Sequence, residues 1–277
     1  MRSLPLRLVG WPIAALVVVA LSAGAGEAAP LQDCAAMLPW GVPAMANDAA
    51  PHTYLCRLAY VVRHNDARHV PDWVAWPTSK ANAAGCLPRS DSFRADPDLP
   101  PGVGATPEDY DEPNFDQGHV AGDGFFNYAA EPEHQSFLMS NMTPQTAANN
   151  RGPYRALEIN SREWAAATPG GVWNLAGPIF GPHPRTIGPT RVAVPDASWM
   201  IVVRGDRAIA VIIPNAMRFS GAHRWQDFVV PIAEVERQAG IRINLPAGIA
   251  HDTKEPAWPV DHGPWTVEHQ AACAHNR

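Results

Sequence analysis

Two polar side chains of the kinds that enzymes use to cut phosphate esters stand about thirty residues apart in the sequence. His119 ends the segment Asp-Gln-Gly-His at residues 116–119, and Asn150 follows a Ser-Asn-Met-Thr-Pro-Gln segment at residues 140–145. A neutral imidazole accepts a proton from water near neutral pH. An amide oxygen is a ligand that a hard cation such as Mg²⁺ accepts. One base beside one cation is sufficient for phosphodiester hydrolysis, so this pair predicts that chemistry.

Two charged residues follow Asn150 at helical spacing. Glu158 lies eight residues after Asn150, and Arg162 lies four residues after Glu158. At about 100° per residue, these three side chains stay on one broad face of a helix. We therefore expect Glu158 and Arg162 to belong to the site. The alternative is an ordinary surface ion pair between residues four apart, which contributes little to stability.

These motifs resemble those of the DNA/RNA non-specific endonuclease family, the ββα-metal nucleases related to Serratia nuclease and endonuclease G. The family carries Asp-Arg-Gly-His, then Ser-Asn-hydrophobic-Thr/Ala-Pro-Gln, then Asn, then a helix with Glu. This chain matches every position except Gln117, which stands where the family has Arg. The resemblance covers most of the chain after residue 29 and is strongest from Asp91 to Glu163.

The resemblance implies an α+β fold, with a central antiparallel sheet that carries a ββα-metal (His-Me finger) element. It implies that His119 is the general base and that Asn150 binds Mg²⁺, for which Mn²⁺ can substitute. In the family the Glu that matches Glu158 holds metal-bound water, and the Arg that matches Arg162 contacts phosphate. The expected substrates are DNA and RNA with little sequence preference, and the expected products carry 5′-phosphates.

The same resemblance assigns supporting roles to other residues. Gln117 is expected to contact substrate without the charge of the usual Arg. Arg89 is carried over as a substrate contact, although the alignment around it leaves Arg94 open. Asn141 and Gln145 are expected at the substrate site, where they shape it by hydrogen bonding.

The assignment of the metal ligand leaves one alternative open, because Asn149 stands next to Asn150. Asn is a preferred helix N-cap, so we expect Asn149 near the cap and Asn150 on the metal.

Asp116 is interpreted as a structural carboxylate. Residues 122–124 (Gly-Asp-Gly) are not a phosphate loop, since no Gly-Lys-Ser/Thr follows. The histidines at 251, 262, 269 and 275 follow no ligand spacing and are interpreted as exposed residues of the tail.

The elements that must position these residues are short. Prolines are spread throughout the chain and argue against a helical bundle. Apolar, β-branched runs predict strands, and Pro153 near a first turn predicts the start of a helix. Residues 89–111 are predicted to be a loop. Strands are expected at 58–63, 72–76, 137–139, 172–176, 191–194, 198–203 and 208–213, and helices at 155–167 and 232–239.

The first 29 residues have the features of a signal peptide. Arg2 and Arg7 precede an apolar run from Trp11 to Leu21, and an Ala-Gly-Ala segment at 23–25 fits a cleavage site. An uncleaved anchor is the alternative, although the run is short for a membrane span. We expect residues 30–277 to form a single domain that is periplasmic or secreted, with no membrane segment in the mature form.

The four cysteines fit an oxidising compartment. Three pairings are possible. Cys34 with Cys56 closes a short loop and leaves Cys86 with Cys273, which ties the C-terminal segment to the body of the protein. The spacing does not suit a zinc site.

The net charge of −6 is unusual for a protein that binds nucleic acid, because phosphate binding depends on Lys and Arg. A local basic patch would resolve the conflict. Two alternatives follow from it: a phosphodiesterase that acts on small phosphate esters, and an exported binding protein whose site is weakened at Gln117.

Overall fold

The computed structural model describes residues 29–46, 49–220, 223–260 and 264–274. The signal peptide expected at residues 1–29 thus lies, apart from its last residue, outside the described residues. Within these ranges no helix combines the length and the apolar character that crossing a membrane requires.

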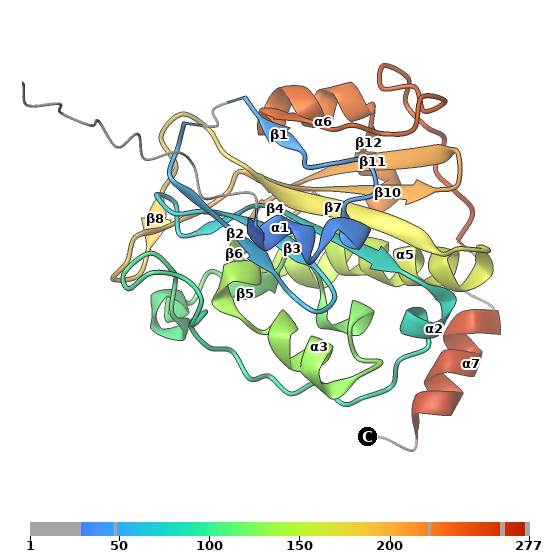
Figure 1. Ribbon diagram of the computed structural model, residues 1–277, viewed down its shortest axis with the longest axis horizontal. Coiled ribbons are helices and arrows are strands. Elements are labelled where there is room, and N and C mark those ends of the chain that lie inside the picture. Colours follow the sequence, from blue (N-terminus) through green and yellow to red (C-terminus); the bar gives the residue numbers. More distant parts are fainter. Residues whose placement is uncertain (1–28, 47–48, 221–222, 261–263, 275–277) are drawn as a thin grey trace, which may run out of the picture.

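A seven-stranded sheet forms the centre of the fold (Figure 1). All neighbouring strands pair antiparallel, which confirms the predicted α+β class with a central antiparallel sheet. The inner strands are buried on both faces, which explains why they read as continuous apolar runs rather than as alternating ones. The spatial order is β12 (Val229–Val230), β11 (Arg207–Pro214), β10 (Ala197–Arg204), β7 (Val172–Ile179), β4 (Val70–Thr78), β3 (Val61–Asn65) and β2 (His52–Cys56).

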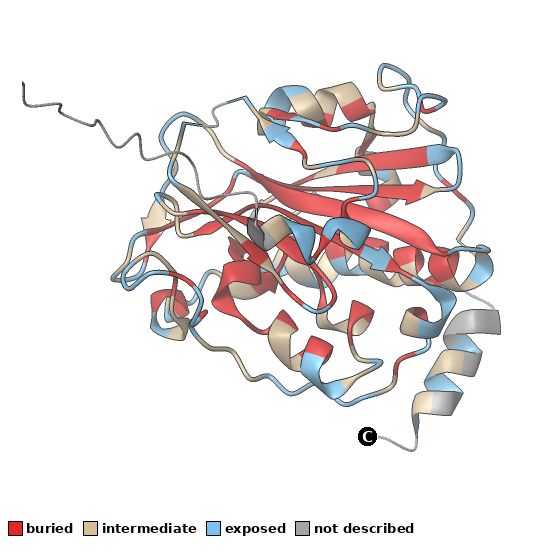
Figure 2. Cartoon of the chain, in the orientation of Figure 1, coloured by how far each residue is buried: buried red, intermediate tan, exposed pale blue. Residues whose placement is uncertain are grey.

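Side chains that alternate along each strand pack into two different cores. From β10, Met200 and Val202 join the core beneath α5 (Arg155–Ala167), whereas Trp199 and Ile201 join the core on the opposite face. The opposite core is covered by α6 (Ile232–Ala239) and by short elements from both ends of the described chain. These are α1 (Ala29–Gln32), η1 (Ala35–Met37), β1 (Ala44–Met45) and β13 (Ile241–Arg242). Figure 2 shows that burial is concentrated in the sheet between these layers.

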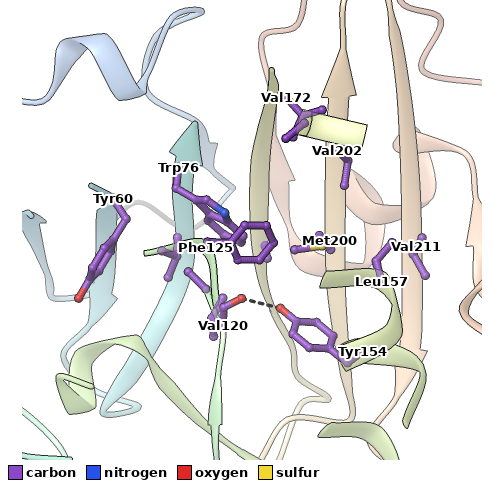
Figure 3. Packing of buried hydrophobic residues seen from close by; sticks show 14 of the residues in the cluster. Tyr60, Trp76, Val120, Phe125, Tyr154, Leu157, Val172, Met200, Val202 and Val211 are labelled. Carbon is purple, nitrogen blue, oxygen red and sulfur yellow. Dashed lines mark hydrogen bonds between the residues drawn. The ribbon is translucent and has the colours of Figure 1, made fainter. Parts of the chain in front are cut away.

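A two-stranded ribbon of β5 (Asp116–His119) and β6 (Met142–Gln145) lies on the α5 side of the sheet. The chain between its strands forms η3 (Asp123–Phe125), α3 (Ala130–Ser136) and η4 (Met139–Asn141). The Tyr154 hydroxyl donates a hydrogen bond of 2.7 Å to the Val120 carbonyl, which ties the start of α5 to the end of β5 (Figure 3). The ribbon and α5 together form the ββα arrangement expected from the sequence.

The other elements are short. They are α2 (Lys80–Ala83), η2 (Pro107–Tyr110), α4 (Ala147–Asn149), η5 (Asn150–Tyr154), β8 (Thr186–Ile187), β9 (Val192–Ala193), η6 (Trp225–Phe228) and α7 (Pro264–Cys273).

Most predicted elements are confirmed, and the exceptions have local causes. The helices at 155–167 and 232–239 match α5 and α6 from end to end, whereas the strand expected at 191–194 shrinks to β9. The strand expected at 58–63 begins only at Val61, because the chain before it forms a turn in which the Arg57 amide donates to the Tyr60 carbonyl. The strand before this turn, β2, was not expected from the sequence. The strand at 137–139 was wrong. Phe137 caps α3 and Met139 begins η4, so the strand starts only at Met142.

Both expected disulfides are confirmed. Cys34 pairs with Cys56 across 22 residues, and Cys86 pairs with Cys273 across 187 residues. The first joins the N-terminal segment to β2. The second joins α7 to the loop that follows α2, so the C-terminal helix is held to the body of the protein.

Candidate active site

The chemistry-bearing residues meet in one cleft of about 630 Å³. Its walls come from the end of β5, from η3, from η5 and α5, and from α7. Side chains predicted from the sequence lie on this cleft: Arg89, Gln117, His119, Asn150, Glu158 and Arg162.

His119 lies at the end of β5, where its imidazole packs between two phenylalanines. The ring centroids lie 4.9 Å from Phe137, in perpendicular contact, and 5.6 Å from Phe93. The residue is 6% exposed. Burial lowers the pKa of His119 to about 4, and nearby Asp123 opposes this shift while Arg89 adds to it. The imidazole is therefore neutral at pH 7 and able to accept a proton.

The residues around His119 explain two further positions of the motif. A Cβ atom on Gly118 would lie 2.4 Å from Cδ of Gln145, so glycine is needed where the Gln145 side chain crosses the ribbon. Gln145 in turn donates to the His119 carbonyl at 3.3 Å. Asn141 accepts from the Ala121 amide and donates to the Ala121 carbonyl, which fixes the backbone just after the histidine.

Asn141 and Gln145 are both fully buried, and neither lines the cleft. Direct contact with substrate, as expected from the sequence, does not fit this burial. Their hydrogen bonds instead hold the ribbon that carries His119, which agrees with the expectation that they shape the site.

Asn150 is oriented by a neighbouring carboxylate. Its amide nitrogen donates to Asp116 at 2.9 Å, which leaves the amide oxygen for another partner. Arg151 donates to both oxygens of the same carboxylate, at 2.6 and 2.9 Å. Asp116 is thus structural, as expected.

Asn149 points away from the cleft. Its side chain is fully buried and donates to the carbonyls of Ile213 and Pro214 at the end of β11. Asn149 does hold the N-cap position of η5, but its side chain makes no capping bond there. The capping side chain nearby is that of Thr146, which accepts from the Asn149 amide at the start of α4. Of the two neighbouring amides, only Asn150 lines the cleft.

The expectation of one continuous helical face also needs correction. Residues 150–154 form a wide turn in which Gly152 has φ −106° and ψ −118°, outside the helical region. Asn150 therefore lies before a kink, and Glu158 and Arg162 lie after it, on α5. They reach the same cleft through the kink rather than through helical periodicity.

Glu158 and Arg162 occupy space left by two glycines that sequence reasoning had set aside. A Cβ on Gly122 would lie 2.4 Å from Oε1 of Glu158, and a Cβ on Gly124 would lie 2.7 Å from Nη1 of Arg162. Arg162 also donates to the Gly124 carbonyl at 3.1 Å. The Gly-x-Gly segment just after the histidine motif was the sequence signal that could have predicted this packing, because two glycines leave room for side chains from α5.

The charge on Glu158 is strongly destabilised in this position. Burial raises its pKa to about 8, and the nearby Asp123 adds to the effect against the opposing pull of Arg162 and Arg155. Oε1 is buried and has no hydrogen-bond partner. A hard cation would give this oxygen a partner, and its positive charge would stabilise the negative charge of the Glu158 carboxylate.

Arg89 reaches the cleft from the loop before Phe93. Its guanidinium lies 4.8 Å from the Phe137 ring and donates to Asp123 at 2.6 Å. Arg94, the alternative, instead donates to the carbonyl of His134 at 2.8 Å and does not line the cleft.

Gln117 lies on the cleft, and its amide nitrogen is 3.5 Å from the Pro107 carbonyl. Four arginines line the cleft despite the acidic chain: Arg89, Arg151, Arg155 and Arg162. Two of them pair with carboxylates, Arg89 with Asp91 and Asp123, and Arg151 with Asp116.

One tail histidine was misjudged. His269 lies on α7, is partly buried and lines the cleft together with Gln270 and Cys273. Burial and then the Arg162 guanidinium lower the pKa of His269. His251 instead contacts Glu236, whereas His262 and His275 lie outside the described residues.

Comparison with known proteins agrees with this geometry. The chain is 32% identical to a nuclease of Nostoc sp. over 213 residues, which cover 69% of this chain and 73% of that one. It is 26% identical to the nuclease of Serratia marcescens, covering 83% and 86%. It is 27% identical to the human mitochondrial nuclease EXOG, covering 67% of this chain and 55% of the human protein.

A solved structure of EndoG with EndoGI has the same fold, with a TM-score of 0.68 and 25% identity, covering 76% of this chain and 90% of that chain. The family model for DNA/RNA non-specific endonucleases matches residues 44–250. The chain therefore belongs to the DNA/RNA non-specific endonuclease family, a family of metal-dependent phosphodiester hydrolases.

Proposed function

We propose that this chain is an exported, metal-dependent endonuclease that hydrolyses phosphodiester bonds of DNA and RNA. The observation that carries the proposal is the cleft itself, which is lined by four arginines and by a buried, neutral His119. Positive charge attracts the phosphate backbone, and a neutral imidazole is ready to take a proton.

The residues present fit a hard cation. Asn150 offers an amide oxygen whose orientation is set by Asp116, and Glu158 offers a buried oxygen without a partner. All these donors are oxygens, which favours Mg²⁺ or Mn²⁺ over softer metals. Asn150 and Glu158 would therefore hold the ion. When bound, the ion supplies positive charge that stabilises the phosphate as negative charge develops on it.

His119 is proposed to remove a proton from water. Its Nε2 atom is buried without a partner, so we assign the proton transfer to Nδ1. The water oxygen then forms a bond to phosphorus while the bond from phosphorus to the 3′-oxygen breaks. The 3′-oxygen takes a proton from solvent, and the imidazolium releases its own. The products are a 5′-phosphate and a 3′-hydroxyl.

The arginines are proposed to hold the substrate through its backbone. Arg162 is fixed by Gly124 beside Glu158, and Arg155 and Arg89 line the same cleft. Contacts of this kind position a nucleic acid without reading its bases, so DNA and RNA are both accepted. Asn141, Gln145 and Gly118 act by holding the ribbon rather than by touching substrate.

Export is proposed from two observations, the N-terminal sequence and the disulfides. The N-terminal 29 residues have the composition of a signal peptide, and all four cysteines are paired. Such bridges persist in oxidising compartments such as the periplasm or the extracellular space. That residues 30–277 form a single domain stays a prediction.

Plasmid nicking with Mg²⁺, with and without EDTA, tests the proposal. Wild-type protein should nick the plasmid only without EDTA, and His119→Ala should lose at least about 10²-fold in rate while it remains folded. Nicking that survives EDTA, or an active His119→Ala, would refute the mechanism. Hydrolysis of a nitrophenyl phosphodiester without nicking would support the small-ester alternative. Binding without hydrolysis of either substrate would support the binding protein.

A further inference from the structure

The four arginines of the cleft do not offer equal positive charge to a substrate. Arg89 forms ion pairs with Asp91 and Asp123, and Arg151 forms one with Asp116. A guanidinium that already faces a carboxylate attracts a phosphate less than an unpaired one does, because the carboxylate repels the phosphate. The charges of these two arginines are therefore largely neutralised by the protein itself.

Arg162 is only partly exposed and is held in place before any substrate arrives. It donates to the Gly124 carbonyl at 3.1 Å, and it lies one helical turn beyond Glu158, the proposed ligand of the ion. The scissile phosphate must reach both this ion and the buried His119. Arg162 is thus placed to contact the scissile phosphate.

Arg155 differs from the other three arginines. It lines the cleft as the first residue of α5, and it is exposed. Within the part of the chain that the structure describes, its side chain forms no hydrogen bond and no ion pair. In a chain with a net charge of −6, its guanidinium is the cleft charge that remains available to attract an anion.

Helix α5 sets the order of the charges along the cleft. Arg155, Glu158 and Arg162 follow one another at spacings of three and four residues, so they lie in that order on one face of the helix. At a rise of about 1.5 Å per residue, Arg155 precedes Arg162 by about 10 Å along the helix axis. With the scissile phosphate beside Glu158 and Arg162, Arg155 faces the part of the substrate that lies further out.

We propose that Arg155 binds the phosphate next to the scissile one, so that the cleft favours chains with at least two phosphates over single phosphodiesters. The inference rests on the proposed nuclease function and deepens it by naming a second phosphate subsite and the residue that forms it. A contact to a backbone phosphate carries no sequence information, so the subsite serves DNA and RNA alike.

The test measures kcat/KM, with Mg²⁺, on a thymidine oligonucleotide and on a nitrophenyl phosphodiester that has a single phosphate. For Arg155→Gln, we expect kcat/KM on the oligonucleotide to fall about tenfold, mainly through KM, which is the scale of one charge-assisted hydrogen bond. On the nitrophenyl ester, kcat/KM should stay at the wild-type value. Arg155→Lys retains the charge and should recover most of the loss on the oligonucleotide.

Arg242→Gln is the matched control. Arg242 is also exposed, has no ion pair among the described residues, and lies on β13, outside the lining of the cleft. Its loss changes the net charge of the chain by the same amount and should leave both values unchanged. Salt gives an independent readout: the slope of log kcat/KM against log salt should become less steep by about 0.7 in Arg155→Gln, and not in Arg242→Gln.

The outcomes separate the subsite from the function on which it rests. A wild-type protein that does not hydrolyse the oligonucleotide would refute the proposed function. With an active wild type, an unchanged oligonucleotide value for Arg155→Gln, or an equal fall for Arg242→Gln, would overturn the subsite. An equal fall of Arg155→Gln on both substrates would also overturn it, because Arg155 would then act on the scissile phosphate.

Discussion

The burial of His119 predicts a specific dependence of stability on pH. The pKa of this imidazole is about 4 in the folded protein, against 6.5 for an ordinary histidine. Between these values the unfolded chain binds the proton and the folded protein does not. The free energy of unfolding therefore falls as pH drops through 6.5 and stops falling, as far as His119 is concerned, below about 4. At pH 7 both states are neutral, and the group makes no contribution.

The size of this loss of unfolding free energy follows from the pKa difference of His119 between the folded and unfolded states. Each unit of pKa difference corresponds to about 1.4 kcal/mol, so at about pH 4.5 the loss is about 2.5 kcal/mol. Urea unfolding of the wild type and of His119→Gln, in EDTA, at about pH 7 and about pH 4.5, isolates this contribution, because all other titrating groups are shared. The wild type should lose that much more stability than the variant on acidification.

The control for this experiment is His183→Gln, which removes an exposed imidazole instead. It should lose as much stability on acidification as the wild type. Equal losses in the wild type and His119→Gln would refute the reasoning, because they would show that the imidazole remains able to take a proton in the folded protein. A neutral base at pH 7 would then need a different explanation.

Four further predictions concern the cleft and the residue beside it, Asn149. Asn150→Ala should raise the Mg²⁺ concentration needed for half-maximal activity by about tenfold or more, as loss of a ligand does. Asn149→Ala should instead lower the free energy of unfolding by about 1–3 kcal/mol, because the buried carbonyl of Ile213 and the partly buried carbonyl of Pro214 lose their donor. Gln117→Arg should raise kcat/KM, with a gain that shrinks as salt rises. Gly122→Ala should lower kcat by about 10²-fold, because the new Cβ would lie within 2.4 Å of the Glu158 carboxylate and displace it.

The controls separate these causes. If Asn149→Ala and Asn150→Ala exchange their effects, Asn149 rather than Asn150 is the metal ligand. A flat rate for Gln117→Arg would indicate that Arg155, already on the cleft, supplies the charge. Gly248→Ala is the matched glycine change, since a Cβ there meets nothing within 4 Å, and it should leave kcat as in the wild type. An equal loss in both glycine variants would contradict the steric argument.

The sequence predicted the sheet and the two main helices because their apolar patterns are local. It also predicted both disulfides, since one pairing closed a short loop and left the other. The convergence of Arg89, His119 and Glu158 on one cleft was inferred from motif resemblance. The burial of His119 could not be inferred, because burial depends on residues distant in the chain. Phe93 and Phe137, which bury His119, lie on separate segments.

The parts that the sequence missed depend on contacts between distant segments. Gly122 and Gly124 are explained only by the side chains of α5, more than thirty residues away. His269 reaches the cleft on α7, a helix that is bonded through Cys273 to Cys86, far away in the sequence. The helical-face argument for Asn150 failed for a different reason: the pattern cannot report a kink that Gly152 permits.

The kink at residues 150–154 has a consequence for how such a site is able to evolve. In a continuous helix, each inserted or deleted residue rotates everything beyond it by about 100° and so removes the carboxylate from the cleft. Here the chain before the kink is fixed by Asn149 on β11, and the chain after it by Tyr154 on Val120. The turn between these two anchors absorbs a change of length. Descendants of this chain could therefore adjust the spacing of amide and carboxylate, and with it the size of ion held, while the hydrophobic core keeps its sequence.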